Sequence, residues 1–389
     1  MSEPPPKHPA KSTARETTII SARRTAARIS QAELAGKCGV TRQFVNLIES
    51  GRTQPNVAVA LKMASALSTT VETLFSIYHP NTSEEISVRL ASPGLHTGAR
   101  LNLVCIGRKW TAYAADTMAT LGGGFGEADA VLLEHKDGEE LSRARMAGGR
   151  TLSEASGNVA FAGCDPALAL LTGSRVAPGL AGRCFWVNCG SGQALRLLAQ
   201  QQAHIAGIHV GDDAGADNMS EINRMDPSGR WQLLRFTCWE QGWMLRPGTR
   251  KQFTGTDALL TGQLRLANRE TGAGSRRWLD RQLELAGVPG NRLPGYAKEF
   301  KSHWECACAL LSEEADIAVG PRAVAAIAGL DFISTGDVAF DLVVPRNLLT
   351  LPKVAAVLEA LRGQRLRDEI ESLPGYRASE AGLPIARRS

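Results

Sequence analysis

Apolar residues recur at three- and four-residue intervals near the N-terminus, which is the spacing of one face of a helix. The pattern predicts helices over about 16–27, 31–37, 42–50, 57–67 and 71–75. In the third of these, Val45 and Ile48 are one helical turn apart and are expected to face the core, and in the fourth Val57, Leu61 and Ala64 recur at helical spacing. Five short helices so close together predict a small all-α domain over 15–78.

Polar residues at the ends of these helices support the assignment. Ser30 and Glu33 have the spacing of a capping box at the start of the second helix. Gly39 can take the positive φ that ends this helix, and Thr41 is placed to cap the next one. Two short helices joined by a glycine-centred turn form a helix-turn-helix, an arrangement that reads DNA.

The stretch SQAELAGKCGVTRQFVNLIESGRTQP resembles the phage-repressor/Cro (Xre-type) helix-turn-helix family, and the resemblance covers about residues 16–78. It implies that the second helix of the motif lies in the major groove of an operator. By position, the side chains facing base edges would be Arg42, Gln43 and Asn46. Those approaching phosphates would be Gln31 and Thr41. Arginine pairs with guanine, and glutamine or asparagine with adenine, so the residue types suit this role. Glu49 is expected to be a structural pairing residue, and the plain alternative for Arg42 and Gln43 is exposed helix positions.

The net charge of the chain lies in this segment. Residues 1–80 contain ten Lys and Arg against five Asp and Glu, a balance of +5. The whole chain has 44 basic and 39 acidic residues, so the remainder is neutral. An excess of positive charge around the motif favours contact with phosphates, although +5 over eighty residues is also common on a solvated surface.

Three segments outside this domain lack strong periodicity. Residues 1–14 are rich in Pro, Lys and Ser, which predicts a disordered tail, and 383–389 is assigned to a C-terminal tail. Residues 76–100 are turn-rich, which predicts a linker. Short apolar runs and Gly-rich turns follow, so 79–152 is assigned to a linker and a small β-containing subdomain. The run GGGFG lacks phosphate-loop spacing and is expected to be a loop.

From residue 153 to 382 the pattern alternates between strands and helices. Such alternation predicts an α/β domain with largely parallel sheets. Separate strands are expected at 233–236 and 242–245, and again at 331–334 and 340–344, with an α-helix starting near Ala167. The strands fall into two groups that divide near 239–246, which indicates two lobes and a cleft.

Ligands of open α/β sheets bind beyond the carboxyl ends of the strands. Three strand-to-helix turns occupy such places, and their Gly, Ser and Thr residues could direct N–H and hydroxyl groups at an anion. The candidate effector-binding residues are Asp165, Ser191, Gly192, Arg269, Thr271 and Ser275, with His209 as a weaker candidate. Each turn taken alone is also an ordinary helix cap, and Asp165 would repel an anion unless a cap consumes its charge.

The phrases ADIAVG, GLDFI, FDLVVPR and LPGY resemble the periplasmic-binding-protein-like domain of molybdate-related cytoplasmic proteins. With the Xre-type motif in front, the chain is similar to regulators of molybdate metabolism. This resemblance implies a type-II two-lobed effector domain that binds molybdate, tungstate or a molybdenum-cofactor species. A single helix-turn-helix contacts a half-site, so a homodimer on double-stranded operator DNA is expected. The alternative is a molybdopterin or oxyanion carrier or biosynthetic enzyme whose helical unit serves protein contacts.

Several other classes have no support in the sequence. No apolar run is long enough to span a membrane, and the N-terminus lacks the apolar core of a signal peptide, so a cytoplasmic protein is expected. The eight cysteines have no zinc-site spacing, and no metal or cofactor is expected. No nucleophile–base set or paired-carboxylate pattern appears, so a catalytic function is not expected.

Overall fold

The computed structural model describes residues 19–75, 84–92, 94–116, 126–136, 138–172, 180–210 and 216–386. The chain divides into two compact units, Met1–Thr82 and Ser83–Ser389. The expected disordered tail at 1–14, the Gly-rich run up to residue 125 and the last three residues lie outside the described part of the chain.

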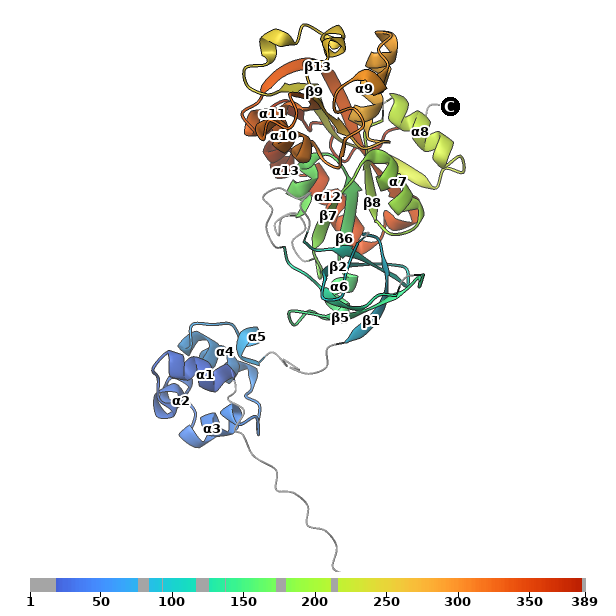
Figure 1. The fold of residues 1–389 in the computed structure, drawn as a ribbon. Coiled ribbons are helices and arrows are strands. Elements are labelled where there is room, and N and C mark those ends of the chain that lie inside the picture. Colours follow the sequence, from blue (N-terminus) through green and yellow to red (C-terminus); the bar gives the residue numbers. More distant parts are fainter. Residues whose placement is uncertain are drawn as a thin grey trace, which may run out of the picture. The chain divides into compact units, whose positions relative to one another are not determined.

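The N-terminal unit contains five helices within its described residues (Figure 1). They are α1 (Ile19–Ala26), α2 (Gln31–Cys38), α3 (Arg42–Glu49), α4 (Val57–Ala66) and α5 (Val71–Phe75). The predicted caps are present. Ser30 Oγ accepts from Glu33 N at 3.1 Å, and Ser30 N donates to the Glu33 carboxylate at 2.7 Å. Gly39 has a φ of 70°, and Thr41 Oγ1 accepts from Phe44 N at 3.1 Å.

Of the three apolar residues that recur at helical spacing in α4, only Ala64 lies on its buried face. Val57 and Leu61 are 76% and 58% exposed, whereas Ala60, Met63 and Ala64 are buried against the other helices. The segment VAVALKMASA is apolar on nearly every side, so its periodicity does not select one face. The contacts of Met63 with the domain core determine which face turns inward.

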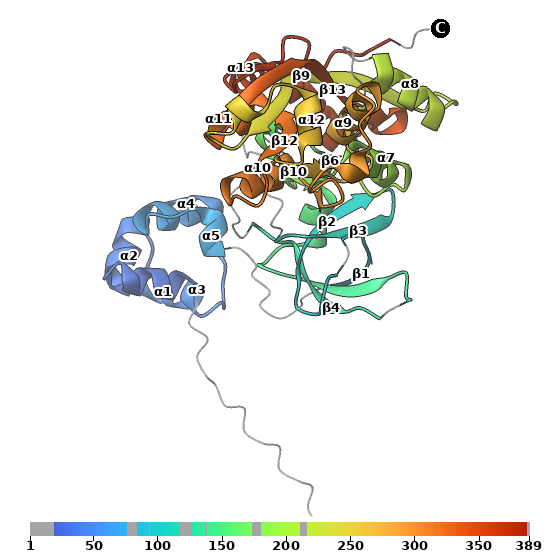
Figure 2. The same ribbon diagram turned by 45° about the horizontal axis from the view of Figure 1, so that its top comes forward.

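The second unit begins with a closed five-stranded barrel (Figures 1 and 2). Its strands are β1 (Glu85–Leu90), β2 (Arg100–Ile106), β3 (Lys109–Ala114), β4 (Ala130–Glu134) and β5 (Ser142–Met146). They pair in the order β1-β3-β2-β4-β5, and β5 closes onto β1. The segment 76–100, expected to be a linker, therefore contains a barrel strand. Val88 of β1 is fully buried in the barrel core, and this burial stabilises a strand within a turn-rich stretch.

Nine further strands form one mixed sheet in the described part of the chain, in the order β11-β10-β12-β9-β13-β8-β6-β7 with β14 on β9. On one side are β6 (Val159–Gly163), β7 (Cys184–Asn188) and β8 (Ile205–Ile208), and on the other β10 (Leu266–Arg269), β11 (Glu299–Phe300) and β12 (Ile317–Pro321). Long strands β9 (Trp231–Leu245) and β13 (Asp331–Pro345) run between them, and β14 is Tyr376–Arg377.

The long strands create two lobes. The first lobe joins β6–β8 to the start of β9 and the end of β13, and the second joins β10–β12 to the end of β9 and the start of β13. The expected pairs of short strands, 233–236 with 242–245 and 331–334 with 340–344, are thus single strands. The outer strands of each lobe are parallel, but β9 and β13 are antiparallel to each other and to β12 and β8. The sheet is therefore less parallel than predicted.

Helices cover each lobe. Those packed on the first lobe are α7 (Ser191–Ala199), α8 (Ala216–Met225), α12 (Pro352–Arg362) and α13 (Gln364–Glu371). Those of the second lobe are α9 (Gly274–Leu285), α10 (His303–Leu311) and α11 (Arg322–Ile327). The segment expected to form an α-helix from Ala167 is a 3-10 helix, Pro166–Thr172. The expected C-terminal tail is partly paired, because Ile385 N donates to Leu233 O at 2.9 Å.

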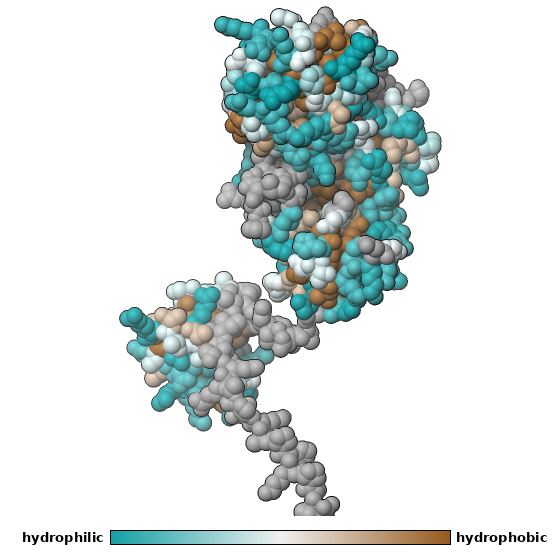
Figure 3. All heavy atoms as spheres, viewed as in Figure 1, coloured by the Kyte–Doolittle hydropathy of each residue, from teal (hydrophilic) through white to brown (hydrophobic). Residues whose placement is uncertain are grey.

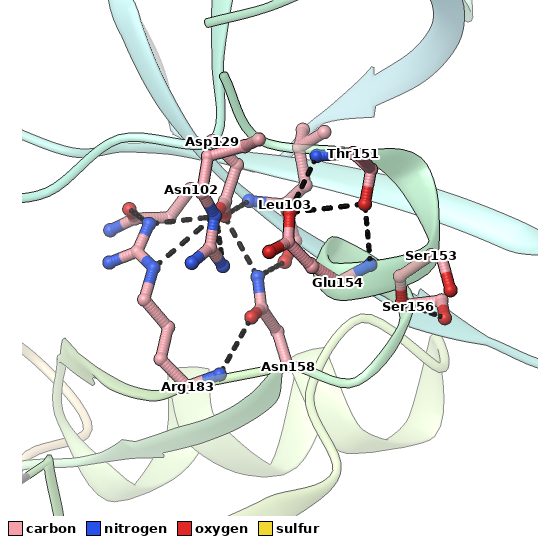
Figure 4. Close-up of polar contacts among 10 residues, drawn as sticks. Asn102, Leu103, Asp129, Thr151, Ser153, Glu154, Ser156, Asn158 and Arg183 are labelled. Atoms are coloured by element: carbon pink, nitrogen blue, oxygen red, sulfur yellow. Dashed lines mark hydrogen bonds and ion pairs between the residues drawn. The ribbon is translucent and has the colours of Figure 1, made fainter. Parts of the chain in front are cut away.

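A buried polar network attaches the barrel to the first lobe (Figure 4). Asp129, fully buried, accepts from Leu103 N at 2.8 Å and from Asn158 Nδ2 at 2.8 Å, and Arg183 lies 3.1 Å from it. Arg183 N in turn donates to Asn158 Oδ1 at 2.9 Å. Short helix α6 (Leu152–Ser156) connects the two parts. Because the Asp129 carboxylate and the Asn158 amide each have partners on both the barrel and the first lobe, these two parts are held in one arrangement.

Polar residues dominate the face shown in Figure 3, and the apolar residues between them form small separate areas. Among the described residues, no helix combines the length and apolarity needed to cross a bilayer.

Candidate functional site

Helix α3 presents a polar face to solvent. Arg42, Gln43 and Asn46 are exposed, whereas Val45 and Ile48 on the opposite side are buried. Their spacing places the three polar side chains on adjoining positions of one helical surface. This is the helix that the glycine-centred turn after α2 leads into, so the predicted base-facing residues share one accessible face.

The two residues predicted to approach phosphates have partners within the domain. Thr41 is the N-cap of α3, and Gln31 Nε2 donates to Glu49 Oε2 at 2.7 Å. Glu49 is also bound by Arg24, whose Nε lies 2.6 Å from Oε1. Glu49 thus ties α1 and α2 to the end of α3, which agrees with its expected structural pairing.

The two lobes of the C-terminal unit meet where β8 ends and α9 begins. Ser191 Oγ donates to His209 O at 2.9 Å and accepts from His209 N at 3.0 Å, which fixes the backbone after β8. Gly274, the first residue of α9, lies directly against it, since a Cβ on Gly274 would be 1.9 Å from His209 O. Gly192 N also donates to Gly272 O at 3.4 Å across the same junction.

Six buried polar atoms at this junction have no hydrogen-bond partner within the described chain. We name them the interlobe cluster: His209 Nε2 from the first lobe, Trp239 Nε1 and Gln241 Oε1 from β9, and Arg269 Nη1, Ser275 Oγ and His303 Nδ1 from the second lobe. All six residues are at most 2% exposed. Unpartnered polar atoms are rare in protein interiors, and six of them in one region indicate a site for a polar ligand.

The members of the interlobe cluster lie close together. The ring centroids of His209 and Trp239 are 5.2 Å apart, and those of Trp239 and His303 are 6.0 Å apart. Gln241 is two residues beyond Trp239 and so on the same face of β9. Ser275 follows Gly274, whose added Cβ would be 2.2 Å from His209 Nδ1. Residues from both lobes and from the strand that joins them therefore meet at this junction.

Burial sets the charges in the interlobe cluster. Burial, together with the nearby charge of Arg269, lowers the pKa of His209 to about 4. Burial likewise lowers the pKa of His303, with Arg269 and His209 adding to the effect. Both imidazoles are therefore neutral at pH 7. Arg269 Nε and Nη2 bind Glu270 at 3.0 and 2.9 Å, so this ion pair offsets the guanidinium charge and leaves Nη1 available.

The chemistry of these atoms suits a small hydrogen-bond acceptor. The N–H groups of arginine and tryptophan only donate, and the serine hydroxyl and a neutral imidazole can each donate one hydrogen. Gln241 Oε1 accepts, so it suits a hydroxyl or a protonated oxygen of a ligand. A tetrahedral oxyanion would receive several donors here in a site that excludes water, where each hydrogen bond is strengthened.

The candidate effector residues divide into three groups. Arg269, Ser275 and His209 belong to the interlobe cluster. Asp165 and Ser191 have structural partners: the Asp165 carboxylate accepts from Ala167 N, Thr237 Oγ1 and Tyr376 OH, at 2.9, 2.6 and 2.7 Å. Gly192 and Thr271 lie beside the junction of the lobes but outside the interlobe cluster, and Thr271 Oγ1 donates to Glu299 at 2.7 Å. The expected repulsion between Asp165 and an anion is reduced because burial raises the pKa of this carboxyl group.

Three members of the interlobe cluster do not follow from sequence patterns, namely Trp239, Gln241 and His303. The first two lie inside a long strand, and the third begins α10 without an adjoining ligand motif. A Trp-x-x-Gly-Trp or lone His gives no local signal for ligand contact, because tertiary packing alone brings these side chains together. Among the described residues, no group of three His, Cys, Asp or Glu side chains is placed to hold a metal ion.

Comparison with known families supports the two-part architecture. Residues 20–74 match the helix-turn-helix family model, and residues 178–362 match the model of the PBP superfamily domain. The chain therefore carries an Xre-type helix-turn-helix domain followed by a two-lobed α/β domain of the periplasmic-binding-protein type.

Individual relatives share parts of the chain. The uncharacterized protein YvgK of Bacillus subtilis (strain 168) is 29% identical over 197 residues, which is 50% of this chain and 63% of that relative, so the chain spans less than two thirds of its length. The crystal structure of the tungstate ABC transporter from Geobacter sulfurreducens is similar to this chain, with a TM-score of 0.42 and 13% identity. The similarity covers 55% of this chain and 98% of the other. CbnR, a LysR family transcriptional regulator, is similar with a TM-score of 0.36 and 14% identity, over 52% of this chain and 67% of the other.

Proposed function

We propose that this protein is a transcriptional regulator whose affinity for DNA changes when a small oxyanion binds between the lobes of its C-terminal domain. The observation that carries the proposal is the interlobe cluster, in a chain that also has a helix-turn-helix. Donors from both lobes converge on one position, and a ligand there would satisfy polar atoms that burial otherwise leaves without partners.

The first candidates for the effector are molybdate and tungstate, with molybdenum-cofactor species as a larger alternative. Tetrahedral dianions without protons accept hydrogen bonds on every oxygen, which matches a site made mainly of donors. The neutral imidazoles and the Arg269–Glu270 ion pair provide dipoles and a partly compensated positive charge. Such a site binds a dianion without a large excess of fixed charge.

Binding at the junction would favour the closed arrangement of the lobes. His209 belongs to the first lobe and Arg269 to the second, so a ligand that contacts both binds the closed arrangement more tightly than an open one. The strands β9 and β13 connect the lobes and are the elements that bend during closure. A difference in free energy between the two arrangements is what the DNA-binding domain would respond to.

The DNA-binding part of the proposal assigns Arg42, Gln43 and Asn46 to base contacts in the major groove. Gln31 and Thr41 would lie near phosphates at the start of α2 and α3. Two copies of the chain would bind a near-palindromic operator as a homodimer, because one helix-turn-helix covers only a half-site.

A calorimetric titration of the full chain with molybdate, tungstate, sulfate and phosphate tests the site. We expect saturable binding of at least one of these anions and a loss of at least tenfold in affinity, about 1.4 kcal/mol, in Arg269→Gln. Arg292→Gln, which removes an exposed arginine from the same lobe, serves as the matched control and should bind like wild type. Absence of binding by all four anions would contradict the oxyanion assignment.

A further inference from the structure

A cavity of about 700 Å³ lies beside the interlobe cluster, and none of the six residues of that cluster lines it. Three parts of the second unit form its walls. The barrel contributes Tyr113, the first lobe contributes β7 and the start of α7, and the second lobe contributes Thr271 and Lys301. We name it the barrel-side cavity. Its volume lies in the range of small-molecule sites, about 300–1,000 Å³, and exceeds what a tetrahedral oxyanion needs.

One wall of the barrel-side cavity is aromatic and fixed in place. Tyr113 OH donates to Gln202 O at 2.9 Å, and Trp186 Nε1 donates to Gly163 O at 2.8 Å. Phe185 packs edge-on against Tyr113 with ring centroids 5.8 Å apart. The polar atoms of Tyr113 and Trp186 are thus bonded to backbone acceptors. Trp186 is half-buried, whereas Tyr113 and Phe185 are only 3% and 5% exposed, so Trp186 offers most of the ring surface that lines the cavity. Rigid aromatic surface of this kind suits a flat, unsaturated ring.

The charged side chains of the barrel-side cavity leave a positive balance. Glu270 is paired with Arg269 at 2.9 Å, and Asp116 is paired with Arg100 at 2.9 Å. Arg196 and Lys301 have no carboxylate partner among the described residues. Gln193 Oε1 accepts from Arg196 Nε and Nη2 at 3.0 and 2.7 Å, which orients the guanidinium group.

The free nitrogen of Arg196 points back along α7. A Cβ on Gly192 would be 3.7 Å from Arg196 Nη1, so this nitrogen lies beside the first turn of the helix, at the edge shared with Gly272. Lys301 reaches the same cavity from the second lobe. Arg196 from the first lobe and Lys301 from the second therefore border the same cavity as the aromatic wall.

We propose that the barrel-side cavity is a second ligand site, for a heteroaromatic molecule that carries a phosphate group. The ring would lie against Trp186, the most exposed ring of the aromatic wall, and the phosphate would lie between Arg196 and Lys301. Arginine can bind phosphate through two parallel hydrogen bonds, and lysine adds a point charge. The inference goes beyond the proposed function and does not rest on it, because the interlobe cluster and the DNA-binding helix are not part of this site.

A ligand in the barrel-side cavity would also favour closure of the lobes. The barrel is bound to the first lobe through Asp129 and Arg183, whereas Lys301 belongs to the second lobe. A phosphate held by Arg196 and Lys301 would therefore connect the two lobes. If a small anion binds the interlobe cluster, the two ligands should increase each other's affinity by the same factor.

The test is a titration of the full chain with three probes, AMP, GMP and neopterin monophosphate, followed by calorimetry and by the fluorescence of its tryptophans. We expect at least one probe to bind, and guanosine or inorganic phosphate alone to bind at least tenfold more weakly. Arg196→Gln and Lys301→Gln should each weaken that probe about tenfold. Arg346→Gln, an exposed arginine bordering a different cavity, should leave its affinity unchanged.

Three results would overturn the inference. The first is no binding by any of the three probes. The second is equal affinity in wild type, Arg196→Gln and Lys301→Gln. The third is loss of probe binding in Arg269→Gln together with simple competition by molybdate, which would place the phosphate in the interlobe cluster. Both substituted side chains are exposed, so a thermal melt that matches wild type verifies folding of the variants.

Discussion

Gly274 contacts His209 across the junction of the two lobes, and a Cβ on Gly274 would lie 1.9 Å from the His209 carbonyl oxygen. No other residue type fits there without separating the lobes. The contact brings the first turn of α9, with Ser275, beside the His209 ring. Closure of the lobes and assembly of the interlobe cluster are therefore one event.

Gly274→Ala should hold the lobes apart. The added methyl group cannot be accommodated between two backbones, so the closed arrangement becomes strained. We expect anion affinity to fall at least tenfold, about 1.4 kcal/mol, and the radius of gyration with ligand to stay at its ligand-free value in small-angle scattering. Gly36→Ala, where no atom lies within 4 Å of the added Cβ, should change neither quantity. Unaltered anion affinity in Gly274→Ala would show that closure at this contact is not needed.

Trp239→Phe tests one donor of the interlobe cluster. The change removes the unpartnered Nε1–H and keeps most of the ring. Stability without ligand should fall by about 1–3 kcal/mol, because the smaller ring leaves a cavity in a fully buried place. Anion affinity of the folded variant should fall in addition by roughly 1–2 kcal/mol, about 5–30-fold. Calorimetry and thermal melts measure the two quantities. Trp278→Phe, an indole that packs on Trp243 outside the cluster, is the control and should leave anion affinity intact.

Stability should fall as the pH drops below about 6.5. Burial lowers the pKa of His209 from 6.5 to about 4 and that of His204 from 6.5 to about 3. Below pH 6.5 these histidines are therefore protonated in the unfolded chain but still neutral in the folded chain. Stability present above pH 6.5 is therefore lost towards pH 4, at about 1.4 kcal/mol per pKa unit, which gives up to about 3 kcal/mol for His209.

Two carboxyl groups act in the opposite direction, Asp341 and Asp165, because burial raises the pKa of both. Burial raises the pKa of Asp341 from 3.8 to about 6, so below pH 6 the folded chain binds this proton first. Burial also lowers the pKa of His303, which acts in the same direction as His209 and His204. We expect the three imidazoles to exceed the effect of the carboxyl groups, so melting temperatures measured from pH 7.5 to 5 should decline. His209→Gln should flatten the decline. A melting temperature that rises steadily over this range would contradict the assignment of neutral, buried imidazoles.

Glu49 is expected to stabilise the N-terminal domain. Glu49→Ala removes the partner of both Arg24 and Gln31 and leaves a partly buried guanidinium without its carboxylate. Because Arg24 is 16% exposed and partly solvated, we expect a loss of about 1–3 kcal/mol rather than the full cost for a buried pair. Hydrogen exchange of residues 19–75 in the full chain measures it. Glu33→Ala, which removes only a capping contact, should cost about 1 kcal/mol or less.

Local signals in the sequence account for the N-terminal domain. The capping box at Ser30, the turn at Gly39 and the cap at Thr41 act within a few residues, so they can be read without knowing the rest of the fold. The buried face of α4 cannot be read from its sequence, because an almost wholly apolar segment has no preferred side. The division into two lobes followed from the alternation of strands and helices in the C-terminal domain. The continuity of β9 did not, since polar residues such as Gln241 interrupt its apolar pattern.

Long-range packing determines the rest. Asp165 and Ser191 stand at turns where ligands commonly bind, yet their oxygens are engaged by Thr237 and by the His209 backbone. Conversely, Trp239 and His303 have no motif around them and become site candidates because folding leaves their ring nitrogens buried and unpartnered. Sequence patterns can locate a turn, but they cannot show which polar atoms already have partners.

The central claim is that a small anion bound between the lobes controls DNA binding by α3. The most direct measurement selects DNA bound by the full chain from a pool of random sequences and then follows its fluorescence anisotropy while molybdate or tungstate is added. We predict that DNA affinity changes at least tenfold on saturation with one of these anions, that Arg269→Gln binds the DNA but no longer responds, and that Arg42→Ala loses the DNA. DNA affinity that is the same with and without either anion, in a protein shown by calorimetry to bind that anion, would contradict the account.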